Sequence, residues 1–97
     1  MSIGRVIKSI LKQKGISQKE LSVKIGKSST AVSQILNGVY HPNPETLGKI
    51  SEVLEIPIPV LNFLSISEDD IPENKKELYK QMHPIMENYV SEMFLNK

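Results

Sequence analysis

The 97-residue sequence contains no cysteine, so it can form neither a disulfide framework nor a cysteine-based zinc site. Its two histidines, His41 and His83, stand alone, without H-E-x-x-H or any other metal-ligand spacing. The acidic run Glu68–Asp70 lacks the spacing of a calcium loop, and there is no glycine-rich phosphate loop. No serine, histidine and aspartate set stands out as a catalytic constellation. We therefore expect no cofactor, no bound metal and no enzymatic activity.

Long apolar runs are also missing. The first residues, MSIGRVIKSIL, lack the continuous apolar segment of a signal peptide. No run approaches the roughly 20 apolar residues that cross a bilayer. The length fits one small domain with an appendage and a modest core. These features predict a cytoplasmic protein that is not associated with a membrane.

Charge is distributed unevenly although the net charge is only +1. Residues 1–50 carry eight basic and two acidic side chains, a net charge of +6. Residues 51–97 carry four basic and nine acidic side chains, a net charge of −5. A basic half beside an acidic half suggests one face that binds a polyanion and another that meets a partner, although scattered lysines are often only a solvated surface.

The stretch 17–38, SQKELSVKIGKSSTAVSQILNG, predicts two short helices joined by a glycine turn. Ser17 can cap the first helix, and Glu20 completes an S-x-x-E capping box. Gly26 stands where that helix must end, at a positive φ where a Cβ would clash. Ser28 then caps a second helix, which stops at Asn37-Gly38. Helix, tight turn and helix form the helix-turn-helix arrangement, whose second helix can enter the DNA major groove.

The pattern of residues at 17–38 resembles that of the Xre-type helix-turn-helix family of phage repressors and Cro proteins. The matching positions are Ser17, Gln18, Glu20, Leu21, Gly26, Ser28, Val32, Ser33 and Gly38, followed by Pro44, Leu47, Ile50, Leu54 and Ile56. The resemblance covers about residues 3–66. It implies an all-α fold, with a five-helix repressor-like helix-turn-helix domain at 1–66 and an additional C-terminal helix within 67–97. Ser22 replaces the usual Ala and Lys27 the usual Val, and we expect these polar atoms to loosen the helix–helix contact slightly.

Apolar spacing predicts the other helices of the N-terminal domain. The first spans 3–14, with Ile3, Ile7, Ile10 and Leu11 on one stripe and Gly15 as its stop. Asn43 and Pro44 open a fourth helix, and Pro57 and Pro59 separate it from a short fifth helix at 60–64. We expect the third and fourth helices to bury these residues between them: Val32, Ile35, Leu47 and Ile50.

The acidic segment 65–71 predicts a hinge, and residues 72–96 predict a helix. We expect Asp70 to cap this helix and Pro84 to kink or split it. Its apolar residues form two adjacent stripes, a face too wide to remain in water unaided. We expect the helix to serve as a dimerisation or partner-binding element through Leu78, Met82, Ile85, Met86, Tyr89, Val90, Met93 and Phe94.

The dimer is expected because one helix-turn-helix unit covers only a half-site. Two copies held about 34–36 Å apart could read successive major grooves. The alternative is that the helix at 72–96 folds back and covers its own five-helix core.

The family resemblance places the DNA-reading candidates on the helix at 28–37. The matching family positions face base edges or phosphates, and here they are Ser28, Ser29, Thr30, Ser33 and Gln34. Gln34 can pair in bidentate fashion with adenine, and the Thr30 methyl could touch a thymine methyl. Because short side chains make few strong base contacts, we expect part of the specificity to come from DNA shape or water. The alternative is that these are ordinary solvent-facing residues.

Flanking residues are expected to hold the DNA backbone. In the family, the amide matching Gln18 and its helix N-terminus hold a phosphate. Lys27 could reach a phosphate or simply be solvated. Asn37, Tyr40 and Asn43 could grip the backbone across the groove, although Asn37 could equally be a C-cap and Tyr40 could cover the core edge.

The sequence therefore predicts a sequence-specific transcriptional regulator, a repressor that binds a palindromic operator in double-stranded DNA as a homodimer. The alternative is an antitoxin-like or adaptor protein whose C-terminal helix binds a second protein, either a toxin or a regulator. The two functions can coexist, since antitoxins of this family often regulate their own operon.

Overall fold

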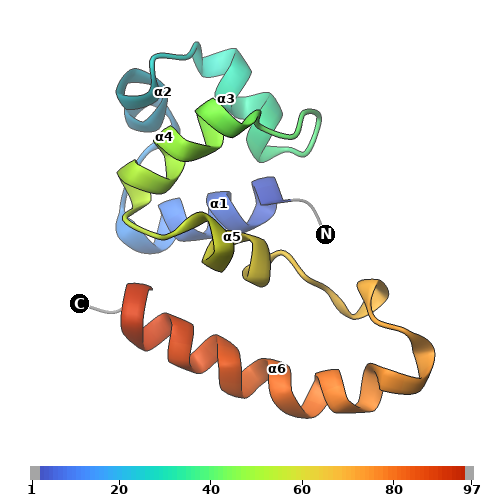
Figure 1. The fold of residues 1–97 in the computed structure, drawn as a ribbon. Helices are drawn as coiled ribbons and strands as arrows, with labels where there is room; N and C mark the ends of the chain where they lie inside the picture. Colours follow the sequence, from blue (N-terminus) through green and yellow to red (C-terminus); the bar gives the residue numbers. More distant parts are fainter. Residues whose placement is uncertain (1–2, 96–97) are drawn as a thin grey trace.

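The computed structural model describes residues 3–95, in which helices are joined by short turns and loops and no strand occurs (Figure 1). The α-helices are α1 (Ile3–Lys14), α2 (Gln18–Ile25), α3 (Ser29–Leu36), α4 (Pro44–Leu54), α5 (Ile58–Leu64) and α6 (Lys76–Val90). The short helical turns are η1 (Glu68–Asp70), η2 (Glu73–Lys75) and the π-helical η3 (Ser91–Leu95). The predicted fold, a five-helix domain with an additional C-terminal helix, is confirmed. Asn96, the last residue of the predicted C-terminal helix, lies outside the described residues.

The core is made of aliphatic side chains from α1 to α5. Burying one such side chain fully stabilises the fold by about 1.5–3 kcal/mol. The main cluster comprises Ile3, Val6, Ile7, Ile10, Leu11, Leu21, Ile25, Val32, Leu36, Leu47, Ile50, Leu54, Ile56 and Leu61. The apolar stripe predicted for α1 is therefore confirmed, and Gly15 ends that helix at a φ of 70°.

The third helix packs on α1 and α2 rather than mainly on α4, which packs on α2 and α5. The four residues expected between the third and fourth helices are all buried, and Val32, Leu47 and Ile50 belong to one core cluster. Gly4 allows α1 and α3 to approach closely, because a Cβ there would collide with the Ile35 carbonyl oxygen. An apolar stripe shows which face of a helix is buried, but it does not show which helix will cover that face.

The fourth helix ends in an unexpected way. Glu55 adopts a left-handed conformation, with φ 58° and ψ 39°, at a position where glycine is the usual residue. The turn is closed by two hydrogen bonds between the same residues. The Ile56 N–H donates to the Ser51 carbonyl oxygen at 3.2 Å, and Ser51 Oγ donates to the Ile56 carbonyl oxygen at 2.6 Å. A glutamate carries no sequence signal for such a stop.

The C-terminal helix folds back against the body of the molecule, where it lies beyond α1 and α5 (Figure 1). Val90 is buried, and Phe94 and Leu95 of η3 pack against the core. At the other end of α6, Tyr79 Oη donates to the Ile66 carbonyl oxygen at 3.2 Å. One face of the helix therefore covers its own core, as the alternative interpretation predicted.

An aromatic cluster closes the contact between α5 and α6. The His83 ring centroid lies 6.0 Å from that of Phe63 and 4.7 Å from that of Tyr79. His83 Nδ1 lies 2.9 Å from Glu87 Oε2. Burial, followed by the nearby carboxylates of Glu87, Glu68 and Asp70, raises the pKa of the Tyr79 hydroxyl. The fold thus favours a neutral Tyr79 that can donate its hydrogen bond.

Neither a split at Pro84 nor a cap by Asp70 is found in this helix. Pro84 does not split it, since α6 continues from Lys76 to Val90. A proline removes one N–H donor, and packing at both ends of α6 holds the helix together. Asp70 does not cap α6 but accepts the Ser67 N–H at 2.8 Å, and this hydrogen bond lowers the Asp70 pKa. Asp70 therefore closes η1, and α6 begins without a side-chain cap.

Candidate nucleic-acid interface

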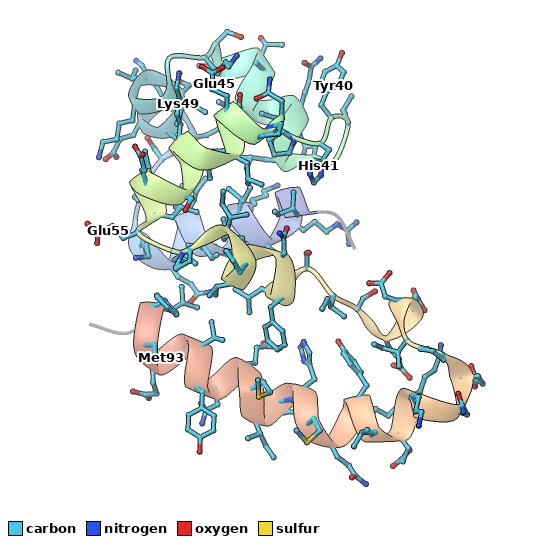
Figure 2. The ribbon with its side chains drawn as sticks, in the orientation of Figure 1. Tyr40, His41, Glu45, Lys49, Glu55 and Met93 are labelled. Atoms are coloured by element: carbon cyan, nitrogen blue, oxygen red, sulfur yellow. The ribbon has the colours of Figure 1, made fainter. Side chains whose placement is uncertain are left out.

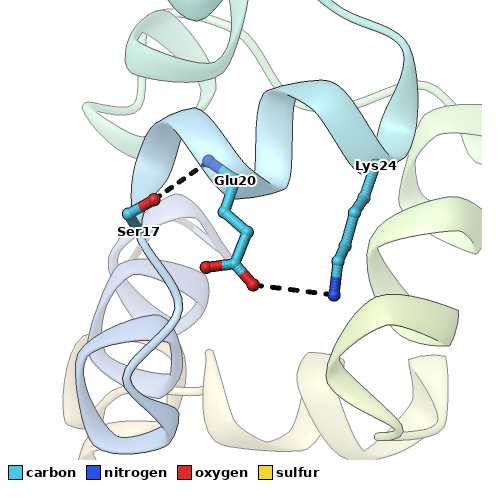
Figure 3. Close-up of polar contacts among 3 residues, drawn as sticks. All are labelled: Ser17, Glu20 and Lys24. Atoms are coloured by element: carbon cyan, nitrogen blue, oxygen red, sulfur yellow. Dashed lines mark hydrogen bonds and ion pairs between the residues drawn. The ribbon is translucent and has the colours of Figure 1, made fainter.

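The start of α2 is fixed by Ser17. Its Oγ accepts the Glu20 N–H at 3.0 Å, as predicted for the N-cap (Figure 3). The Glu20 carboxylate does not complete the expected capping box but lies 3.6 Å from Lys24 Nζ (Figure 3). An i,i+4 partner on the same face of α2 therefore holds this carboxylate instead of the cap backbone. The cap places the exposed Gln18 at the helix N-terminus, where unpaired N–H groups favour an anion.

The turn between α2 and α3 is defined by backbone geometry. Gly26 adopts φ 69° and ψ 33°, the left-handed conformation that the sequence predicts. The Lys27 N–H donates to the Ser22 carbonyl oxygen at 3.0 Å. Ser28 Oγ then accepts the Ala31 N–H at 3.1 Å and caps α3. These hydrogen bonds set the angle at which α3 leaves α2.

The two departures from the family pattern are accommodated. Ser22 is buried, and its Oγ donates to the Lys19 carbonyl oxygen at 2.6 Å, so its polar atom is satisfied within α2. Lys27 is exposed on the turn. The expectation that Lys27 would place polar atoms at the helix–helix contact is therefore wrong, because the left-handed Gly26 turns the next residue toward solvent.

The third helix presents one polar face to solvent. Ser28, Ser29 and Thr30 are exposed at its start. Ser33 and Gln34 are half-buried one turn later, while Val32, Ile35 and Leu36 point into the core. Since residues three and four apart lie on the same side of a helix, the predicted DNA-reading residues come together on this outer face.

The end of α3 joins this face to a loop. Asn37 is the C-cap residue, as one interpretation predicted, and its Nδ2 donates to Ser33 Oγ at 3.3 Å. Gly38 has a φ of 79°, and the Val39 N–H donates to the Gln34 carbonyl oxygen at 2.9 Å. Asn37 remains exposed in this position, so capping does not remove its side chain from the surface.

The loop after α3 carries two exposed apolar side chains. Tyr40 is 58% exposed and points into solvent, so it does not cover the core edge (Figure 2). Val39 is 62% exposed, and the sequence gives no signal for this because its neighbours Gly38 and Tyr40 suggest only a turn. Asn43 caps α4 as predicted, with Oδ1 accepting the Thr46 N–H at 2.8 Å. Its amide nitrogen has no role in that cap.

The lysines around this face are held only weakly. Lys24 Nζ lies 3.6 Å from the Glu20 carboxylate, one helical turn away (Figure 3). Lys49 Nζ lies 3.7 Å from the Glu45 carboxylate, also one turn away (Figure 2). Exposed pairs of this kind contribute about 0–1 kcal/mol. An approaching phosphate could therefore compete with the glutamates for these side chains.

The proposed partner surface is only partly available. Leu78, Met82, Ile85, Met86, Tyr89 and Met93 are 43–65% exposed. Val90 is buried at 7%, and Phe94 packs on the chain's own core. Including Val90 and Phe94 in that surface is therefore wrong, because their stripe faces α1 and α5.

Two other kinds of site are not found between residues 3 and 95. No three histidine, cysteine or acidic side chains come together there as metal ligands. No helix in the same range is long and apolar enough to cross a bilayer.

Comparison with known proteins gives a consistent result. A helix-turn-helix family model matches residues 7–61. The chain is 34% identical over 64 residues to the ImmF control region 10 kDa protein of Bacillus phage phi105, covering 66% of this chain and 71% of the relative. It is 40% identical over 55 residues to the HTH-type transcriptional regulator SlrR of Bacillus subtilis. It is 38% identical over 55 residues to the putative multi-protein-binding factor 1 of Yarrowia lipolytica.

Two of the three relatives are matched over only part of their length. The match spans 56% of this chain for the Bacillus subtilis protein and 57% for the Yarrowia lipolytica protein, and 36% of the length of each relative. No solved structure matches the chain.

Proposed function

The chain belongs to the Xre-type helix-turn-helix family of DNA-binding regulators, and from this premise we propose that it is a transcriptional repressor. It acts in the cytoplasm and binds a palindromic operator in double-stranded DNA as a homodimer, with α3 in the major groove. Repression follows from occlusion of the promoter. The family is one of DNA-binding regulatory domains rather than enzymes.

The polar outer face of α3 is the observation that carries this proposal. Its apolar side is fully used by the core, and its cap and turn are held by local hydrogen bonds. A short helix that exposes only small polar side chains at its start can enter a major groove without steric hindrance. The helix is thus presented as a rigid reading element.

Three side chains are proposed to contact bases. Gln34 is the long amide on this face and pairs with an adenine through its N6 and N7 edge. The Thr30 methyl packs on a thymine methyl, and Ser29 donates or accepts a hydrogen bond at an adjacent base. Because Ser28 and Ser33 are also short, water and groove shape supply the remaining discrimination.

The backbone contacts lie on both sides of α3. Gln18 and the N-terminus of α2 hold one phosphate, and Lys27 reaches the same strand from the turn. Asn37, Tyr40 and Asn43 approach the backbone beyond the far end of the helix. Asn43 uses its amide nitrogen, because its oxygen caps α4.

The proposal is tested by selecting a preferred site from random duplex DNA and measuring the affinity of variants at fixed salt. Gln34→Ala should cost about 1–3 kcal/mol on that site and relax the preference at one base pair. Lys27→Ala is the matched control, since losing a phosphate contact should weaken all sequences equally and reduce the salt dependence.

Two results would contradict this proposal. One is the absence of any preferred duplex sequence. The other is a Gln34→Ala variant with unchanged affinity and base preference on the selected site. Repression itself is measured with a reporter placed behind that site, where wild type should lower expression and Gln34→Ala should not.

A second candidate function is supported by the exposed residues of α6. An antitoxin-like or adaptor protein would use such an apolar surface to bind a toxin or another regulator. Apolar patches of this kind mark interaction sites on soluble domains. A second copy of the chain and a different protein would bind the same exposed residues of α6. How well two copies of α6 can pair therefore bears on which of them is the partner.

A further inference from the structure

The outer face of α6 carries a continuous apolar strip. It consists of Leu78, Met82, Ile85, Met86, Tyr89 and Met93, and these six residues define the α6 strip. Met93 stands in η3, just beyond α6. At about 100° per residue, the five members on α6 lie within an arc of roughly 100° on an ideal helix. Val90, about 40° beyond Met86 on the same count, packs into the core and marks the edge of the exposed arc. The strip is therefore the part of α6 that the fold leaves uncovered.

The spacing of the strip is symmetric about its centre. Successive members are four, three, one, three and four residues apart. The midpoint falls between Ile85 and Met86, and the sequence of intervals is the same in both directions. This matters for self-association, because an isologous interface presents the same patch from both copies and residues pair reciprocally.

We propose that two copies pair through the α6 strip with their α6 helices antiparallel. The twofold axis passes between Ile85 and Met86. Each of these residues then meets its own copy near the axis. Met82 faces the partner's Tyr89, and Leu78 faces the partner's Met93. This inference rests on the proposed function in taking the homodimer as the acting form, and it names the register of that dimer.

The area of the strip is sufficient for such a pairing. Its members are 43–65% exposed, with Met93 and Tyr89 at 65% and 64%. With each of these six side chains about half exposed, burial of both strips removes on the order of 1,000 Å² from water. This value reaches the lower end for a specific interface. A parallel pairing would also be twofold symmetric, but it would set each residue beside its own copy and would make no use of intervals that read the same in both directions.

The position of the strip affects how the dimer meets DNA. The α3 helix and α6 lie at opposite ends of the molecule, with α1 and α5 between them (Figure 1). Met93 points away from that body, whereas Tyr40 lies at the α3 end (Figure 2). Pairing through α6 therefore holds the two α3 helices at the outer ends of the dimer. Half-sites two or more helical turns apart suit this arrangement better than the one-turn spacing of about 34–36 Å.

Single cysteines test the register directly, because the chain has no native cysteine. A disulfide requires Cα atoms about 4.4–6.8 Å apart. Under mild oxidation, Ile85→Cys should form a covalent dimer by itself. Leu78→Cys should not, because its two copies would lie about 22 Å apart at 1.5 Å per residue. An equimolar mixture of Leu78→Cys and Met93→Cys should form the mixed dimer.

Matched controls and opposite outcomes are available for this experiment. Val23→Cys, at an apolar position on α2 that is 74% exposed and so more accessible than any member of the strip, measures random collision. Efficient crosslinking of Leu78→Cys alone would show a parallel pairing and overturn the proposal. A wild-type chain that sediments as a monomer at tens of micromolar would also overturn it. Capture of a different protein without self-crosslinking would assign the strip to that protein instead.

DNA binding by the same variants separates this inference from the proposed function. The oxidised Ile85→Cys dimer should bind duplexes with half-sites about 20–21 bp apart more tightly than those with a spacing of about 10 bp. Crosslinks without any sequence preference would leave the pairing intact and remove the repressor function. Sequence preference without crosslinks would support the repressor function and overturn the proposed pairing. A preference for the 10-bp spacing would contradict the placement of α3 at the ends of the dimer.

Discussion

Single residues at helix ends determine much of the backbone of this protein. Ser17, Ser28 and Asn43 each accept an N–H three residues on, at 3.0, 3.1 and 2.8 Å. These caps are short-range interactions, so the residue types alone predict them. Glu55 is the exception, since it ends α4 with a positive φ that only its surroundings impose.

Replacing Glu55 with glycine should stabilise the fold by up to about 1 kcal/mol. A left-handed conformation strains a side chain that has a Cβ, and glycine removes this strain. The measurement is urea unfolding at constant pH.

The matched control for this change is Glu52→Gly, at an exposed position with helical backbone in the last turn of α4, which should cost up to about 1 kcal/mol. If Glu55→Gly lowered the free energy of unfolding as much as Glu52→Gly does, the left-handed conformation of Glu55 would not be strained.

Contacts between whole helices decide how α3 is presented. The approach of α1 to α3 depends on Gly4, where an added Cβ would collide with the Ile35 carbonyl oxygen and lie 3.1 Å from that of Leu36. Glycine normally weakens a helix interior by about 1 kcal/mol relative to alanine. At this position the close contact outweighs that cost, because backbone atoms cannot move aside as a flexible side chain can.

Gly4→Ala should therefore destabilise the protein by about 1–3 kcal/mol, through overpacking of α1 against α3. It should also weaken DNA binding, because α3 must shift outward. Thermal unfolding and a binding titration on the selected site measure the two effects.

Gly48→Ala provides the control within α4, because a Cβ there meets nothing within 4 Å. This variant should gain about 0.5–1 kcal/mol from helix propensity. A Gly4→Ala protein that gained as much would show that α1 and α3 can separate freely.

The whole molecule depends on how α6 is attached to the N-terminal helices. Val90 and η3 attach one end, and the cluster of Tyr79, His83 and Phe63 attaches the other. Tyr79 contributes through its hydrogen bond to the Ile66 carbonyl oxygen at 3.2 Å. These contacts orient the α6 strip away from the core, where a second copy can reach it.

Tyr79→Phe should lower the stability by up to about 1 kcal/mol at neutral pH, since a partly exposed hydrogen bond is lost. The pKa of Tyr79 is raised from its ordinary value of 10.0. The stabilisation is therefore complete below pH 10.0 and is lost as the pH rises through the raised pKa.

Unfolding measured from pH 7 to pH 11 should show a smaller alkaline loss in Tyr79→Phe than in wild type. Tyr40→Phe, at an exposed site, is the control and should follow wild type. If the stability of Tyr79→Phe and of wild type varied identically with pH, the Tyr79 hydroxyl would not contribute to the attachment of α6.

The sequence by itself determined most of the helices, the N-caps Ser17, Ser28 and Asn43, and the polar outer face of α3. These features depend on hydrogen bonds across three or four residues and on apolar periodicity, which a single chain displays directly. The left-handed Gly26, the N-cap Ser28 and the buried Val32 all follow from such local chemistry.

Only the tertiary structure decided which apolar surfaces meet. Two stripes on the C-terminal helix looked alike in sequence, yet Val90 is buried and Tyr89 is 64% exposed. The stretch around Pro84 remained helical because packing at both ends of α6 compensates for one missing hydrogen bond. Burial is a property of the complete arrangement of helices, since a side chain is removed from water only by whatever the rest of the chain places over it.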